Sequence, residues 1–168
     1  MGTGGGGYCR FVPSWAQVFP GTPGQVRTAR RFVAGLLKGS PLLDDAMVVL
    51  SELFTNALCH TVSGRPGGLV TVQVSRWRLG VRIAVTDQGS ISEPAIRHPA
   101  GCGEPIENGH GLYLAASLAS RLGWHDDARG RTVVAVLGEL PPGHSGRSPQ
   151  CVGDEARSGV PRAGGRGR

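Results

Sequence analysis

The sequence predicts an α+β domain with two layers, in which helices cover one face of a mixed, mostly antiparallel sheet. After one short strand, two helical segments are expected at about residues 22–38 and 40–61, and two strand segments follow at 69–75 and 81–87. Neighbouring strands without a crossover helix favour antiparallel pairing, and helices grouped in the sequence favour a single covered face. Apolar residues make up 39% of the chain and charged residues 18%, which suits a globular domain.

Segments rich in Gly, Pro, Ser or Arg lie at both ends of the 168-residue chain. Residues 1–14 and 141–168 hold too few large apolar side chains to offset the entropy lost when a chain becomes ordered. We therefore expect both ends to be disordered and one folded domain to span residues 15–140.

The first strand and helix of this domain carry clear boundary signals. The strand is expected at about Trp15–Phe19. Thr22 is then a suitable cap for a helix with Pro23 in its first position. This helix is expected to run to about Lys38, where Gly39 ends it.

The second helix and a strand hairpin complete the first half of the domain. Ser40–Pro41 repeats the cap-plus-proline signal, so the second helix is expected to follow it and run to about Thr61. A turn cluster at residues 63–68 leads to two strands, Leu69–Ser75 and Val81–Asp87, which lie at hairpin distance.

A third helix and a final strand are expected in the second half. A long loop rich in Gly and Pro spans about residues 88–110, and the third helix is expected at residues 111–122. One or two strands then end the domain, with one at Arg131–Leu137. The apolar face of the third helix comprises Leu114, Ala115, Leu118 and Leu122.

The composition argues against several classes of protein. No apolar run approaches the roughly 18 residues of a membrane span, and the Gly-rich start has no signal-peptide core, so we expect a cytoplasmic protein with no membrane partner. Much of the net charge of +6 lies after Leu140, where arginines outnumber the acidic residues, which is more typical of a solvated tail than of nucleic-acid binding. The cysteines are far apart and are expected to be free thiols, not a zinc site or disulfides: Cys9, Cys59, Cys102 and Cys151.

A polar stripe runs along the second helix, in the segment SELFTNALCH at residues 51–60. Glu52, Asn56 and His60 are four residues apart and share one helix face, which fits either a solvated face or a functional site. As a site, Asn56 offers Mg²⁺ a neutral oxygen ligand, and Glu52 can hold a metal-bound water or take a proton from an attacking hydroxyl. His60 is expected to be structural or peripheral.

Three further segments hold candidate ligand groups. Asp87 ends an apolar strand and can accept a hydrogen bond from the exocyclic amine of adenine, while Gly89 allows close approach of the ring; an ordinary Asx turn explains the same residues. The segment NGHGL at 108–112 fits either an anion site at a helix start or a glycine-rich loop entering a helix. In the segment GRT at 130–132, the Thr132 hydroxyl either reaches the base or belongs to an ordinary strand residue.

The order of these segments resembles the GHKL ATPase superfamily, which includes the ATPase domains of histidine kinases. More closely, the chain is similar to anti-sigma-factor serine/threonine kinases. The resemblance covers roughly residues 15–138 and implies a left-handed Bergerat-type sandwich. It rests on FPGTP at 19–23, the N-box-like SELFTNALCH at 51–60, the G1-like VTDQG at 85–89, the G2-like GHGL at 109–112 and GRT at 130–132.

The resemblance implies a role for each matched residue. Asn56 would coordinate Mg²⁺ and Glu52 would act as general base. Asp87 would bind the adenine amine with Gly89 beside the ring, and Thr132 would complete the adenine pocket.

The resemblance also implies a flexible lid over ATP. Gly109 and Gly111 would belong to this lid, and His110 and Leu112 would contact phosphate through their backbone amides.

With ATP and Mg²⁺ as cofactors, the implied function is a regulatory kinase that phosphorylates a Ser or Thr of a small anti-sigma-factor antagonist. The alternative is a non-catalytic ATP-binding module that sequesters a sigma factor or another regulator. Relatives often dimerise, so a homodimer is a further expectation. Nucleic-acid binding through residues 141–168 is a third hypothesis. A histidine kinase is disfavoured, because no helix with a phospho-acceptor His precedes the domain.

Overall fold

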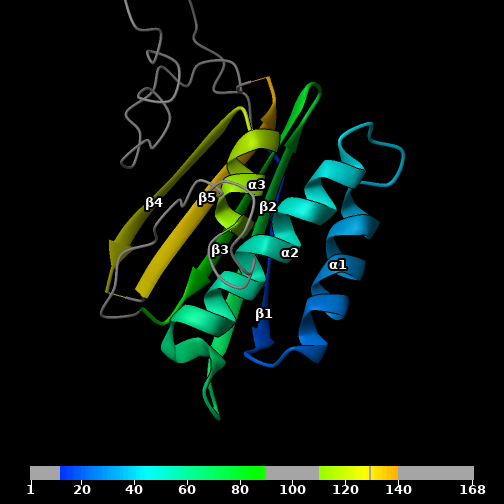
Figure 1. Cartoon of the computed structure of the whole chain (residues 1–168). Coiled ribbons are helices and arrows are strands. Elements are labelled where there is room, and N and C mark those ends of the chain that lie inside the picture. Colours follow the sequence, from blue (N-terminus) through cyan, green and yellow to red (C-terminus); the bar gives the residue numbers. More distant parts are fainter. Residues whose placement is uncertain (1–11, 90–109, 129, 140–168) are drawn as a thin grey trace, which may run out of the picture.

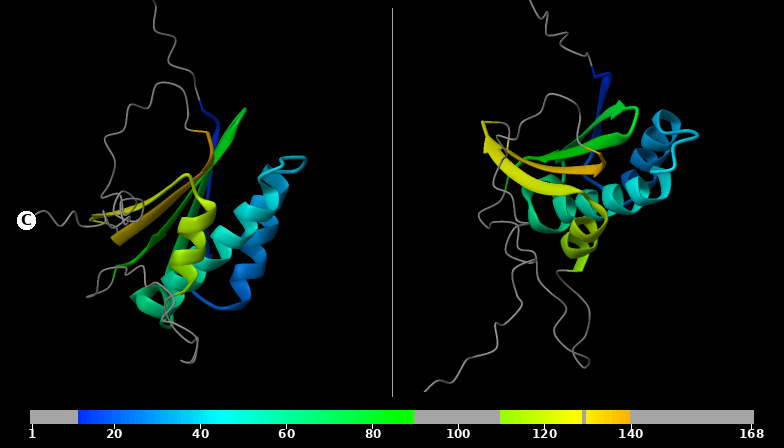
Figure 2. Two further views of the ribbon diagram at one scale, coloured as in Figure 1. Left: turned by 45° about the horizontal axis from the view of Figure 1, so that its top comes forward. Right: turned by 90° about the horizontal axis from the view of Figure 1, so that it is seen from above.

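The computed structural model of the chain describes residues 12–89, 110–128 and 130–139. In these residues helices α1, α2 and α3 lie on one side of a single sheet (Figure 1), and two further views show the same separation into layers (Figure 2). The elements in chain order are β1 (Ser14–Pro20), α1 (Gly24–Leu36), α2 (Leu43–His60), the short 3-10 helix η1 (Val62–Gly64), β2 (Leu69–Trp77), β3 (Gly80–Asp87), α3 (His110–Leu118), β4 (Arg121–Asp127) and β5 (Gly130–Gly138).

The five strands form one sheet in the order β1-β2-β3-β5-β4. Each neighbouring pair is antiparallel, so the sheet of the described residues contains no parallel pairing. The predicted α+β two-layer class is confirmed, and the sheet is antiparallel where a mixed one was allowed for. Strand β5 lies between β3 and β4, which brings the last strand of the domain beside the end of β3.

The core lies between the helices and one face of the sheet. Because side chains alternate along a strand, β2 directs Val70, Val72 and Val74 to this face, and β3 directs Ile83 and Val85 to it. All five side chains are buried. The other face of the sheet has no helix of the described residues against it.

Helix α2 supplies the other half of the core. Its buried side chains include Leu50, Leu53, Phe54 and Ala57, which recur at the three- and four-residue spacing of one helix face. The Phe54 ring packs edge-on against Phe19 of β1, with ring centroids 6.0 Å apart. Removing a buried aromatic ring of this kind costs about 3–5 kcal/mol, so α2 is firmly held against the sheet.

The helix starts lie slightly later than the sequence predicts. Thr22 does not cap α1 through its side chain: its carbonyl accepts a turn hydrogen bond from the N–H of Gln25, and α1 begins at Gly24 with no side-chain cap. Ser40 accepts a hydrogen bond from the backbone of Leu42 in a similar turn, and α2 begins at Leu43. At α1 the Thr22 carbonyl takes up the N–H group that the side-chain cap was expected to satisfy, and at α2 the Ser40 hydroxyl bonds to Leu42 just before the helix begins.

The predicted third helix is too long at its carboxyl end. Helix α3 ends at Leu118, and Leu122 is a buried residue of strand β4. Leu114, which was assigned to the apolar face of this helix, has 42% of its surface exposed. The N–H of Ser120 donates to Val136 of β5, so pairing with a distant strand replaces the local helical pattern.

Several expectations concern residues at or beyond the edges of the described ranges. Ser14, the last residue expected to be disordered, is the first residue of β1. The structure does not describe residues 1–11 and 141–168, which were expected to be disordered. It also does not describe residues 90–109, which make up nearly all of the loop predicted at 88–110. Within the described ranges, none of the helices has the length and apolar character needed to cross a bilayer.

Candidate functional site

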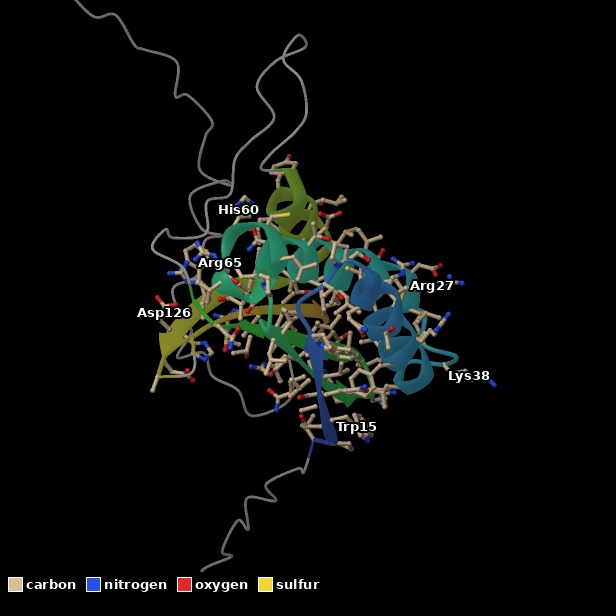
Figure 3. The ribbon with its side chains drawn as sticks, turned by 90° about the horizontal axis from the view of Figure 1, so that it is seen from below. Trp15, Arg27, Lys38, His60, Arg65 and Asp126 are labelled. Atoms are coloured by element: carbon tan, nitrogen blue, oxygen red, sulfur yellow. The ribbon has the colours of Figure 1, made fainter. Side chains whose placement is uncertain are left out.

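Helix α2 presents the predicted polar stripe along one face. Glu52 and Asn56 are half-buried, whereas His60 at the end of the helix is exposed. Their burial decreases along the stripe, so the first two residues lie at the packed part of the helix and the third at its rim. In the view from below, His60, Arg65 and Asp126 lie on the side of the molecule away from Arg27 (Figure 3).

Glu52 lies directly against the first turn of α3. A Cβ atom added to Gly111 would collide with Glu52 Oε2 and would lie only 3.3 Å from the carboxyl carbon. Glycine is therefore the residue that allows this carboxylate to rest on the α3 backbone. The N-box-like and G2-like segments, far apart in the sequence, are brought together at this contact.

The start of α3 also places the other predicted lid residues that the structure describes. His110 is the first residue of the helix, and the side chain of Leu112 is buried in the core. The N–H groups of a first helical turn have no acceptor within the helix, and the helix dipole favours an anion at this end. Gly109 and the His110 side chain lie outside the described part of the chain.

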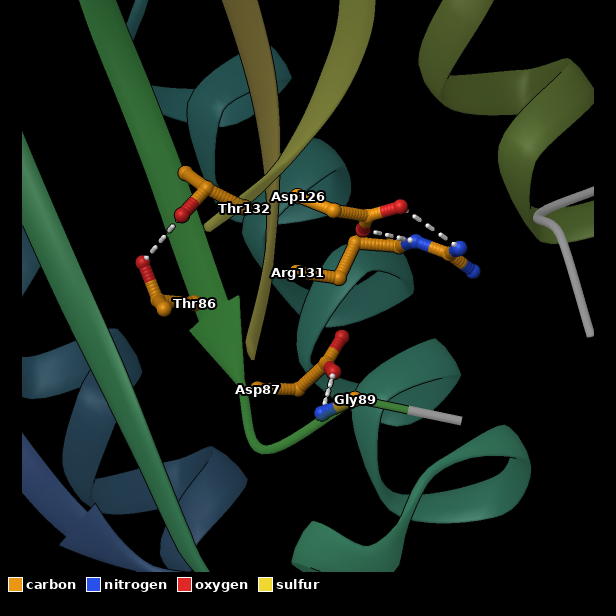
Figure 4. A network of polar contacts seen from close by, with 6 residues as sticks. All are labelled: Thr86, Asp87, Gly89, Asp126, Arg131 and Thr132. Carbon is orange, nitrogen blue, oxygen red and sulfur yellow. Dashed lines mark hydrogen bonds and ion pairs between the residues drawn. The ribbon is translucent and has the colours of Figure 1, made fainter. Parts of the chain in front are cut away.

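Asp87 ends strand β3 and is almost fully buried, with 3% of its surface exposed. Its Oδ1 atom accepts a hydrogen bond of 2.7 Å from the N–H of Gly89, which forms the Asx turn considered from the sequence (Figure 4). Gly89 has a φ of +84°, a conformation that glycine adopts without strain. A buried carboxylate at a strand end is thus held in a defined orientation.

Burial sets the electrostatics of Asp87. Loss of solvent raises the pKa of Asp87, and this effect outweighs the Gly89 N–H and the positive charge of Arg131, which both lower it. A carboxyl group with a raised pKa in a buried position is a recurrent property of functional sites.

The structure does not bring Thr132 to Asp87. In the β3–β5 register Thr132 faces Thr86, and Asp87 faces Arg131. The two threonine hydroxyls are 2.8 Å apart, and alternation puts them on the sheet face opposite to Asp87 and the helices (Figure 4).

Arg131 is the residue of this segment that shares the face of Asp87, and the sequence interpretation assigned it no role. Its side chain is mostly buried and forms an ion pair with Asp126 of β4, with Nε and Oδ1 2.7 Å apart. The contact to Arg131 lowers the pKa of Asp126. Arg131 could have been identified as the residue opposite Asp87 only if the β3–β5 register were known, because that register pairs the two residues.

Metal ligands are sparse on the described residues. No group of three or more His, Cys, Asp or Glu side chains there has the arrangement of a metal site. Mg²⁺ commonly binds through one or two protein ligands and the phosphates of a nucleotide. The half-buried Asn56 amide supplies one hard oxygen atom of the kind that Mg²⁺ prefers, and Glu52 lies one helical turn away. This donor set fits the ion.

In the described residues, a two-layer α+β fold of helices on one antiparallel sheet is consistent with the fold of the GHKL ATPases. The sequence model of the family described as histidine kinase-like ATPase domain matches residues 19–137. The chain belongs to this family, and membership implies that it binds ATP. Comparison with curated proteins gives no match.

Proposed function

We propose that this protein is an ATP-binding regulator of the anti-sigma-factor type that transfers the γ-phosphoryl group of ATP to a Ser or Thr of a small antagonist protein. The observation that carries the proposal is the contact between Glu52 of α2 and Gly111 of α3. It joins a candidate base to a helix start that can bind phosphate. We place this activity in the cytoplasm, where ATP is available.

Recognition of the purine would belong to the Asp87–Gly89 turn. The carboxylate is buried and oriented by the Gly89 N–H, so it can accept a hydrogen bond from the exocyclic amine of adenine without first being desolvated. Gly89 has no side chain to obstruct the ring. Thr132 faces Thr86 on the other sheet face, so this proposal assigns it no contact with the base.

Phosphate binding would belong to α2 and α3. The N–H groups at the start of α3 offer hydrogen bonds to the phosphate oxygens. Asn56 would hold Mg²⁺, which neutralises charge on the phosphates when bound. Glu52 would accept the proton of the attacking hydroxyl, a role open to a half-buried carboxylate beside the phosphate-binding helix.

The kinase proposal is tested with γ-labelled ATP, Mg²⁺ and purified candidate antagonist proteins. Glu52→Gln should abolish label on the antagonist but leave ATP binding in place, because it removes the base and keeps the shape of the side chain. Asp44→Asn, on an exposed acid at the start of the same helix, is the matched control and should transfer label normally. Equal labelling by the Glu52→Gln variant would exclude Glu52 as the base.

A second candidate function is a non-catalytic ATP-binding module that sequesters a sigma factor or another regulator. It uses the same Asp87–Gly89 turn and the same Asn56 amide to bind nucleotide, and it requires no base at Glu52. This candidate predicts ATP-dependent partner binding without label transfer, and the same binding by Glu52→Gln. A homodimer is compatible with both candidates, and analytical ultracentrifugation of the purified chain tests it.

A further inference from the structure

We propose that Ser63 is the positioning residue that holds the Asp87–Gly89 turn in the conformation that discriminates the purine; this proposal rests on the nucleotide site proposed above. Ser63 lies in η1, after the end of α2, and is completely buried. It does not belong to the N-box-like, G1-like or G2-like segments, and a buried hydroxyl in a connecting segment calls for a reason.

The Ser63 hydroxyl connects two strands. Its Oγ donates to the carbonyl of Leu69 at the start of β2, at 2.6 Å, and accepts from the backbone N–H of Gln88, at 2.9 Å. Gln88 is the residue between Asp87 and Gly89, so this bond acts on the centre of the turn. The Gln88 side chain completes a closed cycle of hydrogen bonds among Ser63, Leu69 and Gln88, because its Oε1 accepts from the N–H of Leu69 at 3.0 Å.

A second set of bonds ties the same turn to helix α2. The N–H of Val62 donates to the carbonyl of Gly89 at 3.1 Å. The N–H of Ser63 donates to Thr61 Oγ1, which in turn donates to the carbonyl of Ala57. Ala57 directly follows Asn56, so the base-recognition turn and the proposed metal ligand are connected through η1.

Close packing fixes the Ser63 backbone. A Cβ atom at Gly21 or at Gly68 would collide with the carbonyl oxygen of Ser63. The segment is therefore enclosed by backbone on two sides, and it cannot shift to compensate for a lost hydrogen bond. Replacing the hydroxyl by hydrogen removes the acceptor of the Gln88 N–H and the donor to the Leu69 carbonyl.

The geometry assigns Ser63 to the base end of the nucleotide, which gives it a signature that a purely structural residue lacks. Inosine triphosphate carries a carbonyl oxygen where ATP carries the exocyclic amine, so it should be rejected by a correctly placed Asp87 carboxylate. The phosphates of the two nucleotides are identical. A displaced turn should therefore lower the preference for ATP over inosine triphosphate and leave phosphate binding intact.

The test measures dissociation constants for both nucleotides by calorimetry, at a temperature where each variant is shown to be folded by circular dichroism. Ser63→Ala should lower the ATP preference about tenfold, the factor that corresponds to one hydrogen bond of ordinary strength. Gln88→Met removes the hydrogen bond from the Leu69 N–H to the exposed Gln88 side chain, and it should also lower the preference for ATP. This second variant keeps the test valid if Ser63→Ala fails to fold. Ser75→Ala is the matched control, because its hydroxyl bonds to Ser14 on the open face of β2.

The outcomes separate this inference from the proposed function. If wild type prefers ATP and Asp87→Asn loses the preference, but Ser63→Ala and Gln88→Met retain it, Ser63 is structural only and the inference is overturned. If wild type binds neither nucleotide, or does not distinguish them, the nucleotide site itself fails and takes the inference with it. The positioning role is supported if Ser63→Ala and Gln88→Met both lose the preference for ATP over inosine triphosphate while Ser75→Ala keeps it.

Discussion

Replacing Asp87 by Asn changes a buried charge with almost no change of shape. The side chain is nearly inaccessible to solvent, and an Asn Oδ1 can still accept the hydrogen bond from Gly89. The pKa of Asp87 is raised in the folded protein, so the folded state holds its proton more tightly than the unfolded state does. Stability of wild type should therefore fall, relative to the Asn variant, as the pH rises from the usual aspartate value through the folded pKa.

The same substitution should weaken nucleotide binding. A hydrogen bond to a charged acceptor is worth about 1.5–3 kcal/mol, so losing the charge should raise the dissociation constant for ATP roughly 10- to 100-fold. At an ATP concentration 100 times the wild-type dissociation constant, ligand stabilises wild type by about 2.7 kcal/mol. At the same concentration the Asn variant should gain only about 0.4–1.4 kcal/mol.

The assay is a thermal-shift titration with ATP and Mg²⁺ at several pH values. For a domain of this size the wild-type stabilisation corresponds to a rise in Tm of roughly 10 °C. Asp44→Asn, which neutralises an exposed acid at the start of α2, serves as the control and should keep the full shift. A full ATP shift in the Asp87→Asn variant would refute the assignment of the purine to Asp87, and no shift in wild type would refute nucleotide binding.

Three other substitutions test separate parts of the structure. Asn56→Ala should remove the Mg²⁺-dependent part of the ATP shift and leave the Mg²⁺-free part, and equal shifts with and without Mg²⁺ in wild type would count against the metal role. Gly111→Ala should displace the Glu52 carboxylate and lower phosphoryl transfer at least tenfold, whereas Gly35→Ala, whose added Cβ meets no atom within 4 Å, should raise stability by about 0.5–1 kcal/mol and leave transfer unchanged. Phe54→Ala should lower the free energy of unfolding by about 3–5 kcal/mol in urea titrations, and a loss below about 1 kcal/mol would contradict the packing of α2 on the sheet.

Features of the fold that depend on neighbouring residues were predictable from the sequence. The hairpin of β2 and β3 follows from period-two alternation around a short connection, and the amphipathic α2 follows from apolar residues at three- and four-residue spacing. Gly39 stands in the turn after α1 with a φ of +76°, as the glycine stop signal predicts. The shared face of Glu52 and Asn56 is also a local property, because it depends only on the pitch of one helix.

Features that depend on pairing between distant segments could not be read in the same way. Strand β4 exists because Arg121–Asp127 pairs with β5, although its first residues continue the apolar spacing of α3. The GRT segment contains both Arg131 and Thr132, and only the β3–β5 register decides that the arginine shares the face of Asp87. A shift of one residue in that register would reverse the two.

The sequence by itself determined the class of the domain, the order of its elements as far as α3 and the segments in which polar groups gather, because these follow from the repeat of a helix or strand. The tertiary structure alone decided that Gly111 receives the Glu52 carboxylate, and that Ser63 bridges β2 to the turn after β3. Those contacts join residues of different elements. Their existence depends on how the helices dock on the sheet, and no local pattern of residue types encodes that docking.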